Sequence, residues 1–149
     1  MKIVVGIDGE NYTDLYYGFV KTEDEAYEWF EDDAESLECF KLEREGNRFT
    51  GYYWRYPSDS IPDFTVYECY DINEKPYILV WWHAYNGVDF TVRQFDTFKE
   101  ANDVIKDESN YAWTEEDALE NEDIIQGNGK VCVDIGDEWE MWQIIKREV

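Results

Sequence analysis

Short apolar runs separated by turn residues make up most of the chain, and only a few stretches show helical spacing instead. Runs rich in β-branched and aromatic residues predict strands at residues 2–8, 12–20, 39–44, 48–54, 64–70, 77–85, 88–95, 131–135 and 138–146. Turn-forming pairs separate neighbouring strands at Gly46-Asn47, Asn86-Gly87 and Gly136-Asp137. Asn86-Gly87 is the strongest of these signals, because both central residues of a type I′ turn need a positive φ. The pattern therefore predicts antiparallel hairpins.

The segment 22–38 carries the clearest helical pattern. Thr22 and Glu25 have the spacing of a capping box, in which each side chain satisfies a free backbone N–H of the first turn. At about 100° per residue, one arc of this helix is apolar: Ala26, Trp29, Phe30, Ala34 and Leu37. The opposite arc carries carboxylates: Asp24, Glu28, Glu31, Glu35 and Glu38. We expect the apolar arc to pack on a core and the acidic arc to face a partner. Asp33 interrupts the apolar arc and predicts that the last turn frays.

A second capping signal, from Thr97 to Glu100, lies 75 residues after the first. The same offset aligns other positions of the two halves: Asp14 with Asp89, Leu15 with Phe90, Val20 with Phe95, Trp29 with Val104 and Phe30 with Ile105. We interpret this as a tandem duplication of a ββαββ unit. The alternative is that two hairpin-to-helix junctions share a capping box by chance. The predicted fold class is α+β, with one or two antiparallel sheets and helices packed on one face.

The segment 56–63 holds two of the three prolines and predicts a linker or a long loop. We assign residues 1–55 to the first ββαββ half. Residues 64–149 form the second half, with an extra strand and an acidic helical insert. At 149 residues the two halves are expected to form one compact domain.

A two-residue turn at Asn86-Gly87 would pair Tyr85 with Val88 and Trp82 with Thr91. One face of this hairpin would carry Leu79, Trp81, His83, Val88, Phe90 and Val92, and the other Trp82, Asp89, Thr91 and Arg93. We expect the first face to be core. Trp82 would then lie on the more polar face, beside Arg93. We favour the interpretation that Trp82 covers the sheet inside the domain, and the alternative is that it forms a platform for a partner.

The charge is strongly negative and unevenly distributed. The formal net charge is −23, from 36 acidic and 13 basic residues, and the sequence pI is about 4.1. Such a surface repels nucleic acid and anionic membranes, so we expect no direct binding to either. The aromatic content of 18% argues against disorder. The amino terminus lacks the apolar run of a signal peptide, and no segment has the length of a membrane span, which predicts a cytoplasmic protein.

Signatures of catalysis are missing from the sequence. Three cysteines without metal-binding spacing, Cys39, Cys69 and Cys132, predict neither a disulfide framework nor a zinc site. His83 is the only histidine, and a hydrogen-bonded structural role suits it better than that of a base. There is no G-x-S-x-G elbow and no glycine-rich phosphate loop. We therefore predict a protein that is not an enzyme, with no catalytic residue, no metal site and no cofactor.

Two acidic segments without any Lys or Arg are candidate partner-binding sites. One is the helix at 22–38, and the other is the stretch 107–123, where Thr114 and Asp117 resemble another helix start. The residues that we expect to contact a partner are Asp24, Glu28, Glu31, Asp32, Glu35, Glu38, Glu115, Glu116, Glu120 and Trp82.

The spacing of the charges indicates the kind of partner. Carboxylates on successive turns lie about 5–6 Å apart, which approaches the charge spacing of a nucleic-acid backbone. We therefore expect a basic protein as partner, and favour an acidic inhibitor that mimics nucleic acid. Its target would be a DNA- or RNA-binding enzyme such as a bacterial nuclease or defence complex, as for small phage proteins that block restriction or CRISPR enzymes. The alternatives are an immunity protein that neutralises a nuclease toxin, and a non-catalytic acidic structural or carbohydrate-binding domain.

Overall fold

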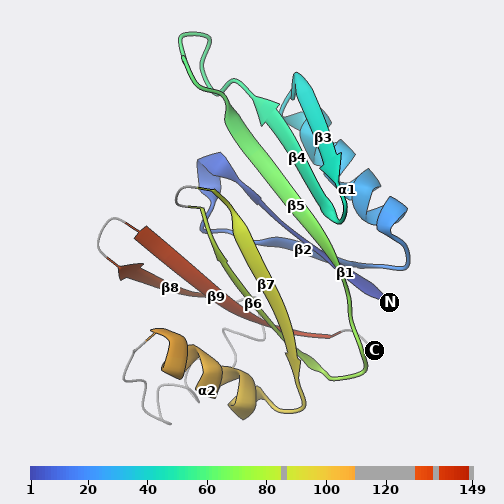
Figure 1. The fold of residues 1–149 in the computed structure, drawn as a ribbon, viewed down its shortest axis with the longest axis vertical. Helices are drawn as coiled ribbons and strands as arrows, with labels where there is room; N and C mark the ends of the chain where they lie inside the picture. The colour runs from blue at the N-terminus through green and yellow to red at the C-terminus, as the bar shows by residue number, and fades with distance from the viewer. Residues whose placement is uncertain (85–86, 110–129, 136–137, 148–149) are drawn as a thin grey trace. The chain divides into compact units, whose positions relative to one another are not determined.

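The chain forms two compact units, residues Met1–Ile72 and Asn73–Val149, in the computed structural model (Figure 1). The structure describes residues 1–84, 87–109, 130–135 and 138–147. Among these residues it contains two antiparallel sheets and two α-helices, which confirms the α+β class.

Unit 1 is a five-stranded antiparallel sheet with one helix. Its elements are β1 (Lys2–Asp8), a short 3-10 helix η1 (Gly9–Asn11), β2 (Tyr16–Val20), α1 (Glu23–Ser36), β3 (Lys41–Glu45), β4 (Arg48–Tyr53) and β5 (Asp63–Asp71). The strand order is β2-β1-β5-β4-β3, so the last strand of the unit lies between β1 and β4. The strand β3 forms one edge of the sheet, and all five of its residues are exposed.

The helix α1 begins where the sequence predicts. Thr22 Oγ1 accepts a hydrogen bond from the Glu25 backbone N–H at 3.1 Å, and Glu25 Oε2 accepts one from the Lys21 N–H at 2.9 Å. This is a capping box in which the glutamate reaches one residue further back than expected. Ala26, Phe30 and Ala34 are buried against one face of the sheet, where they meet Val4, Val20, Phe49, Tyr67 and Cys69. The helix continues to Ser36, so the expected fraying after Asp33 is not observed.

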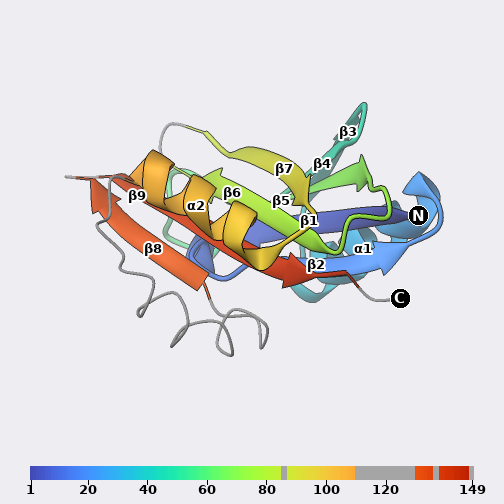
Figure 2. The ribbon, with the colours of Figure 1, turned by 90° about the horizontal axis from the view of Figure 1, so that it is seen from below.

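Unit 2 is a four-stranded antiparallel sheet with a helix on one face. Its elements are β6 (Tyr77–His83), β7 (Asp89–Phe95), α2 (Phe98–Ser109), β8 (Lys130–Ile135) and β9 (Glu138–Lys146), in the strand order β7-β6-β9-β8. Figure 2 shows α2 lying along this sheet. Ala101 and Ile105 of α2 are fully buried and pack with Leu79, Trp142 and Ile144. Thr97 Oγ1 caps the helix by accepting from the Glu100 N–H at 3.2 Å.

The structure corrects the predicted division of the chain. The strand predicted at 64–70 is assigned by the sequence to the second half, but β5 pairs with β1 and β4 and completes the sheet of unit 1. The segment 56–63 is therefore a loop within unit 1 that ends where β5 begins, and the two units divide after Ile72. Composition favours a loop at 56–63, but it carries no information about which strands pair across it.

The central hairpin has a different register from the predicted one. His83 pairs with Asp89 and Trp82 with Phe90, so five residues connect the two strands instead of two. The shift of one residue places Trp81 with Thr91 and Val80 with Val92. Because β6 is apolar on both faces, its hydrophobic pattern does not determine the register. Residues 85 and 86 lie outside the described residues, and Gly87 has a φ of +120°.

Candidate protein-binding surface

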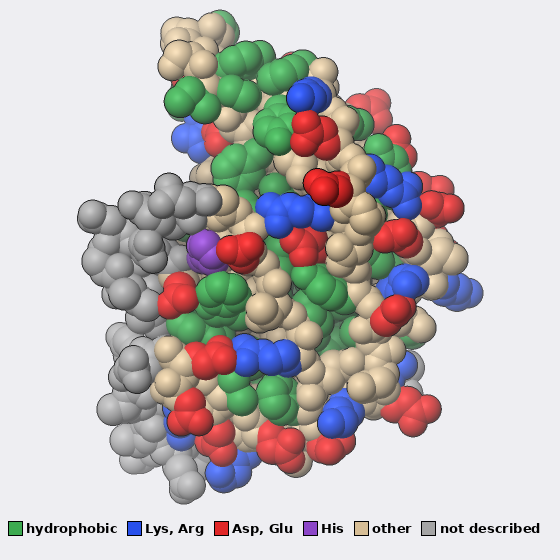
Figure 3. Space-filling model, viewed as in Figure 1, with side chains coloured by type: hydrophobic (Ala, Val, Ile, Leu, Met, Phe, Trp, Pro, Cys, Tyr) green, Lys and Arg blue, Asp and Glu red, His purple; other side chains and the backbone are tan. Residues whose placement is uncertain are grey.

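The acidic arc of α1 lies on the surface, as expected. Its carboxylate residues are all exposed: Asp24, Glu28, Glu31, Asp32, Glu35 and Glu38. In Figure 3 acidic side chains gather on the side of unit 1 where Figure 1 places α1 and β3. Two glutamates four residues apart, such as Glu31 and Glu35, destabilise a helix by a few tenths of a kcal/mol, about as much as an opposite-charge pair stabilises it.

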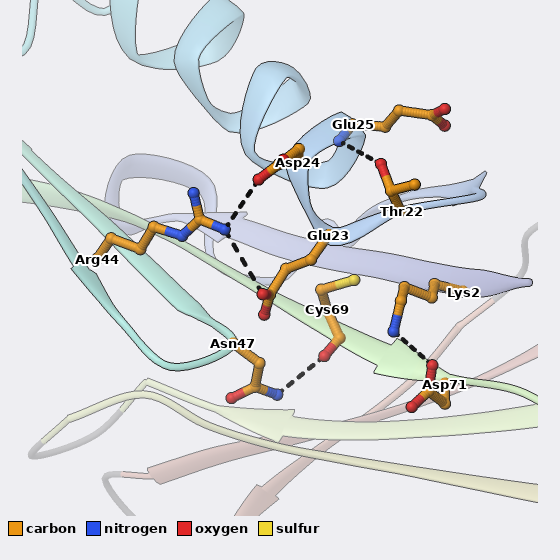
Figure 4. Close-up of polar contacts among 9 residues, drawn as sticks. All are labelled: Lys2, Thr22, Glu23, Asp24, Glu25, Arg44, Asn47, Cys69 and Asp71. Atoms are coloured by element: carbon orange, nitrogen blue, oxygen red, sulfur yellow. Dashed lines mark hydrogen bonds and ion pairs between the residues drawn. The ribbon is translucent and has the colours of Figure 1, made fainter.

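A basic residue of β3, Arg44, lies at the amino-terminal end of this arc. The sequence of the helix segment does not indicate this contact. Arg44 Nη2 lies 3.3 Å from Asp24 Oδ1 and 3.5 Å from Glu23 Oε2 (Figure 4). The same guanidinium group lies 4.7 Å from the centre of the Tyr27 ring. Asp24 is therefore already paired within the chain. None of the ten ion pairs between two described residues includes Glu28, Glu31, Asp32, Glu35 or Glu38.

A groove lies beside the carboxyl-terminal half of α1. It has a volume of about 360 Å³ and is lined by Glu31, Ala34, Glu35, Glu38, Cys39 and Leu42, the last of these from β3. Three carboxylates therefore border a floor that is partly apolar. A long basic side chain combines these two properties, because its aliphatic stem packs on apolar surface while its charged end stays near carboxylates. We call this groove, together with the unpaired carboxylates of α1, the acidic groove.

Glu38 occupies an unfavourable backbone position at the end of α1. Its φ is +57°, and the hydrogen bonds from the Cys39 N–H to the Ala34 carbonyl (3.0 Å) and from the Glu38 N–H to the Glu35 carbonyl (3.1 Å) form a Schellman motif. Glycine is usual at this position, because other residues are strained there. A negative charge is also unfavourable at a helix carboxyl terminus. Both the backbone strain and the negative charge at the helix end therefore make glutamate at position 38 unfavourable for stability.

Glu38→Gly is expected to raise the free energy of unfolding by about 1 kcal/mol, because glycine adopts the left-handed conformation without strain. Glu38→Ala is the matched control, since it removes the same carboxylate and keeps the strain. The difference between the two variants in urea denaturation reports the backbone term alone. Equal stability of both variants would contradict the assignment of strain at this position.

Two exposed aromatic side chains, Phe40 and Trp54, lie near the acidic groove, because Phe40 follows the groove residue Cys39 in the chain. Phe40 and Trp54 stack with ring centres 5.3 Å apart and an angle of 15° between the planes. They remain 54% and 48% exposed, and Leu42 is 41% exposed. The Phe40 N–H donates to the Tyr52 carbonyl at 2.9 Å, which holds Phe40 beside β4. Tyr and Trp anchors in a desolvated pocket dominate many protein interfaces, so this pair adds apolar contact area that the carboxylates do not provide.

A second polar cluster lies beneath α1 and is satisfied within unit 1. Asp33 Oδ2 accepts from Thr65 Oγ1 at 3.0 Å and also interacts with the Tyr67 hydroxyl. Asp8 accepts from the Tyr53 hydroxyl and from the Glu10 N–H. Burial and the neighbouring carboxylates raise the pKa values of Tyr53 and Tyr67, so both hydroxyls stay protonated and act as donors. The bonds explain why Asp33 does not fray the helix.

The titration of Asp33 is expected to make unit 1 less stable as the pH rises. Burial raises the pKa of Asp33 above its ordinary value of 3.8, against the opposing effect of the Thr65 and Tyr67 hydrogen bonds. The folded protein therefore holds this proton more tightly than the unfolded chain, and the stabilisation present below the ordinary pKa is lost as the pH rises through the raised value.

Asp33→Asn cannot ionise and keeps an acceptor for Thr65. The stability of the variant relative to the wild type should therefore increase from acidic to neutral pH. Urea denaturation of both proteins across this range checks the slope, and comparison of the two removes the general repulsion of the acidic surface. A stability difference that is independent of pH, or one that falls as the pH rises, would contradict the raised pKa.

The remaining predicted site residues fall into two groups. Trp82 has no exposed surface, so the prediction that it contacts a partner is wrong in this structure. The physical reason is the register shift, which places Trp82 beside Phe90 and Met141 and puts Arg93 on the other face. Glu115, Glu116 and Glu120, together with the predicted helix start at Thr114, lie outside the described residues.

His83, Cys39 and Cys69 are paired or protonated in the described part of the chain. His83 Nε2 lies 2.8 Å from Asp89 Oδ2, and the His83 ring lies 5.2 Å from that of Trp81. Burial raises the pKa of the Cys39 and Cys69 thiols, which disfavours the thiolate form that a nucleophile requires. No group of three or more His, Cys, Asp or Glu side chains within the described ranges could hold a metal ion.

No helix in the described part of the chain is long and apolar enough to cross a membrane. Comparisons of this chain with protein-family models, with curated proteins and with solved structures find no match.

Proposed function

We propose that this protein is an acidic, non-catalytic inhibitor that binds a basic nucleic-acid-binding protein through the acidic groove. The observation that carries the proposal is the set of exposed, unpaired carboxylates on one side of α1, three of which border a partly apolar groove. Charge of one sign concentrated in a groove attracts a partner of opposite charge and raises the association rate.

Arg44 provides an internal example of the recognition that we propose. Its guanidinium group contacts two carboxylates of α1 and lies over the rings of Tyr27 and Phe49, at 4.7 and 5.2 Å. An arginine or lysine of a partner that enters the acidic groove would meet Glu31, Glu35 and Glu38 around apolar side chains in a similar way. Guanidinium groups bind carboxylates and aromatic faces together more readily than ammonium groups do.

The target that we favour is a DNA- or RNA-binding enzyme, such as a bacterial nuclease or defence complex. A surface that holds a nucleic acid carries Lys and Arg at intervals that match the phosphates. The unpaired carboxylates of α1 follow one another on successive helical turns, about 5–6 Å apart, and would occupy the same positions. The protein would then exclude the nucleic acid from the binding groove of the target enzyme.

The stacked pair of Phe40 and Trp54 favours a second candidate function. Exposed aromatic side chains have no counterpart in a phosphate backbone, but they suit an immunity protein that covers a nuclease toxin outside its nucleic-acid groove. In that case the protein would still bind a basic partner, but nucleic acid would not compete with it.

A pull-down from bacterial lysate tests both functions. The tagged protein is loaded with lysate and eluted first with a salt gradient, and in a parallel column with duplex DNA or RNA. Release of a basic nucleic-acid enzyme by both eluents supports the mimic. Release by salt but not by nucleic acid supports the immunity function, and a protein that retains no basic partner from any tested lysate would contradict both.

We also propose that the two units arose by duplication of a ββαββ unit. The support is twofold. Thr22 and Thr97, 75 residues apart, cap α1 and α2 with the same hydrogen bond, and in each unit the first strand pairs with both the second strand and the last. Unit 1 has five strands, one more than a ββαββ repeat requires, so it is a ββαβββ unit.

A further inference from the structure

A cavity in unit 2 has the composition of a binding site that is separate from the acidic groove. It has a volume of about 420 Å³, within the range of small-molecule pockets. Its lining comes from three adjacent strands and the end of α2: Trp81, Thr91, Arg93, Glu108, Glu140 and Trp142. Trp81 and Trp142 are paired across β6 and β9, so two indole rings contribute to the same wall.

The positive charge in this cavity is already neutralised. Arg93 Nη1 and Nη2 donate to the two oxygens of Glu108 at 2.6 and 2.8 Å, and Trp142 Nε1 donates to Glu108 at 3.2 Å. These bonds hold the pKa of Glu108 below its usual range, with the Arg93 hydrogen bond as the main cause. The Nε atom of Arg93 is also buried and has no hydrogen-bond partner among the described residues. The Arg93–Glu108 pair therefore forms a fixed, neutral side of the cavity.

The negative charge of Glu140 is not neutralised by any described residue. Glu140 is half-buried on β9 and lines the cavity, and its carboxylate forms no hydrogen bond or ion pair with the residues described. Nearby, His83 is paired with Asp89. A group that enters the cavity therefore meets aromatic faces, the Thr91 hydroxyl and one unpaired carboxylate. Aromatic faces and a carboxylate together attract a cation, since the negative face of the indole adds to the charge of the carboxylate.

We propose that this cavity binds an organic cation, a guanidinium or alkylammonium group on a short aliphatic chain. The cation contacts the Trp81 face and the Glu140 carboxylate, and its chain occupies the apolar part of the cavity. This site does not depend on the acidic groove or on the function proposed for it. Anions are disfavoured because Arg93, the one cationic side chain among the described lining residues, is already bound to Glu108.

The test uses the full chain labelled with 5-fluorotryptophan, whose seven tryptophans each give a ¹⁹F signal. The probes are argininamide and citrullinamide, each acetylated on its α-amino group so that only the guanidinium group is charged and citrullinamide is the neutral isostere, with methyl glucoside as a sugar. Argininamide should shift the Trp81 and Trp142 signals with a Kd on the order of 1 mM, as expected for a small ligand, and citrullinamide should bind at least tenfold more weakly. A Gly-Arg-Gly peptide distinguishes the two sources of the cation: binding tighter than argininamide assigns the site to a peptide side chain, and equal binding assigns it to a small-molecule cation.

Glu140→Gln should weaken argininamide binding at least tenfold. Trp81→Leu should also weaken it, because the substitution removes an aromatic face and leaves every charge in the cavity unchanged. Glu100→Gln, an exposed glutamate of α2 that is not part of the lining, is the matched control and should bind as the wild type does. Circular dichroism confirms that each variant is folded. Equal binding of argininamide and citrullinamide, preferential binding of the glucoside, an unchanged Kd in Glu140→Gln, or no shift of either indole signal would each overturn the proposal.

Discussion

Reversing three charges of the acidic groove, with Glu31→Lys, Glu35→Lys and Glu38→Lys in one variant, is expected to abolish binding of the basic partner while the fold is kept. These residues are exposed and unpaired within the described part of the chain, so the folded state loses no ion pair. Charge pairs across interfaces couple by about 1.5–7 kcal/mol, so three reversals should weaken binding by at least about 1000-fold. The melting temperature should stay equal or rise, because repulsion within α1 is relieved and a positive charge at position 38 suits the helix carboxyl terminus.

A matched control changes the net charge by the same amount at other places. Glu45→Lys, Glu74→Lys and Asp96→Lys alter three exposed residues that do not line the acidic groove. If binding depended on net charge alone, both triple variants would lose affinity equally, and the proposed surface would be wrong. Titration calorimetry with the captured partner at two salt concentrations separates the cases, because long-range attraction is screened at high salt.

Phe30→Ala is expected to destabilise the protein by about 3–5 kcal/mol, the usual cost of removing a buried phenylalanine. Phe30 is fully buried, and its ring lies 5.6, 5.8 and 5.8 Å from those of Tyr27, Phe49 and Tyr67. The loss is a large part of the stability of an ordinary domain. Urea denaturation followed by circular dichroism measures it.

Phe40→Ala is the control for this substitution, because it removes the same side chain from a position that is 54% exposed. It should cost less than about 1.5 kcal/mol, since much of that ring already contacts water and little cavity is left. Similar losses for the two variants would mean that α1 does not pack on the sheet through Phe30. Because Phe40 belongs to the exposed aromatic pair, the same variant also reports whether that pair contributes to partner binding.

Local signals in the sequence were sufficient for the elements and for the acidic arc. The β1 and β9 bounds and the α1 cap follow from patterns that span only a few residues, such as the Thr22–Glu25 spacing. The exposure of Glu28, Glu31 and Glu35 follows from helical geometry alone. These features depend on neighbours in the chain, which a single sequence contains.

Features that depend on distant parts of the chain could not be predicted in the same way. The place of β5 in the sheet of unit 1 is a pairing choice among several similar strands, and the register of β6 is ambiguous because both of its faces are apolar. Arg44 reaches Asp24 only because β3 lies beside α1, twenty residues further along the chain. Leu42 joins the acidic groove for the same reason.

The pairing of the first strand of each unit with its last has a consequence for the order of folding during synthesis. The hairpin of β1 and β2 can form early, but the second edge of β1 stays open until β5 has left the ribosome. The same holds for β6, which awaits β9 near the carboxyl terminus. Long-range pairings of this kind slow folding and leave apolar strand edges exposed for longer. During that interval the dense negative charge of the chain acts against association with other nascent chains, a benefit of the acidic composition that is independent of any partner.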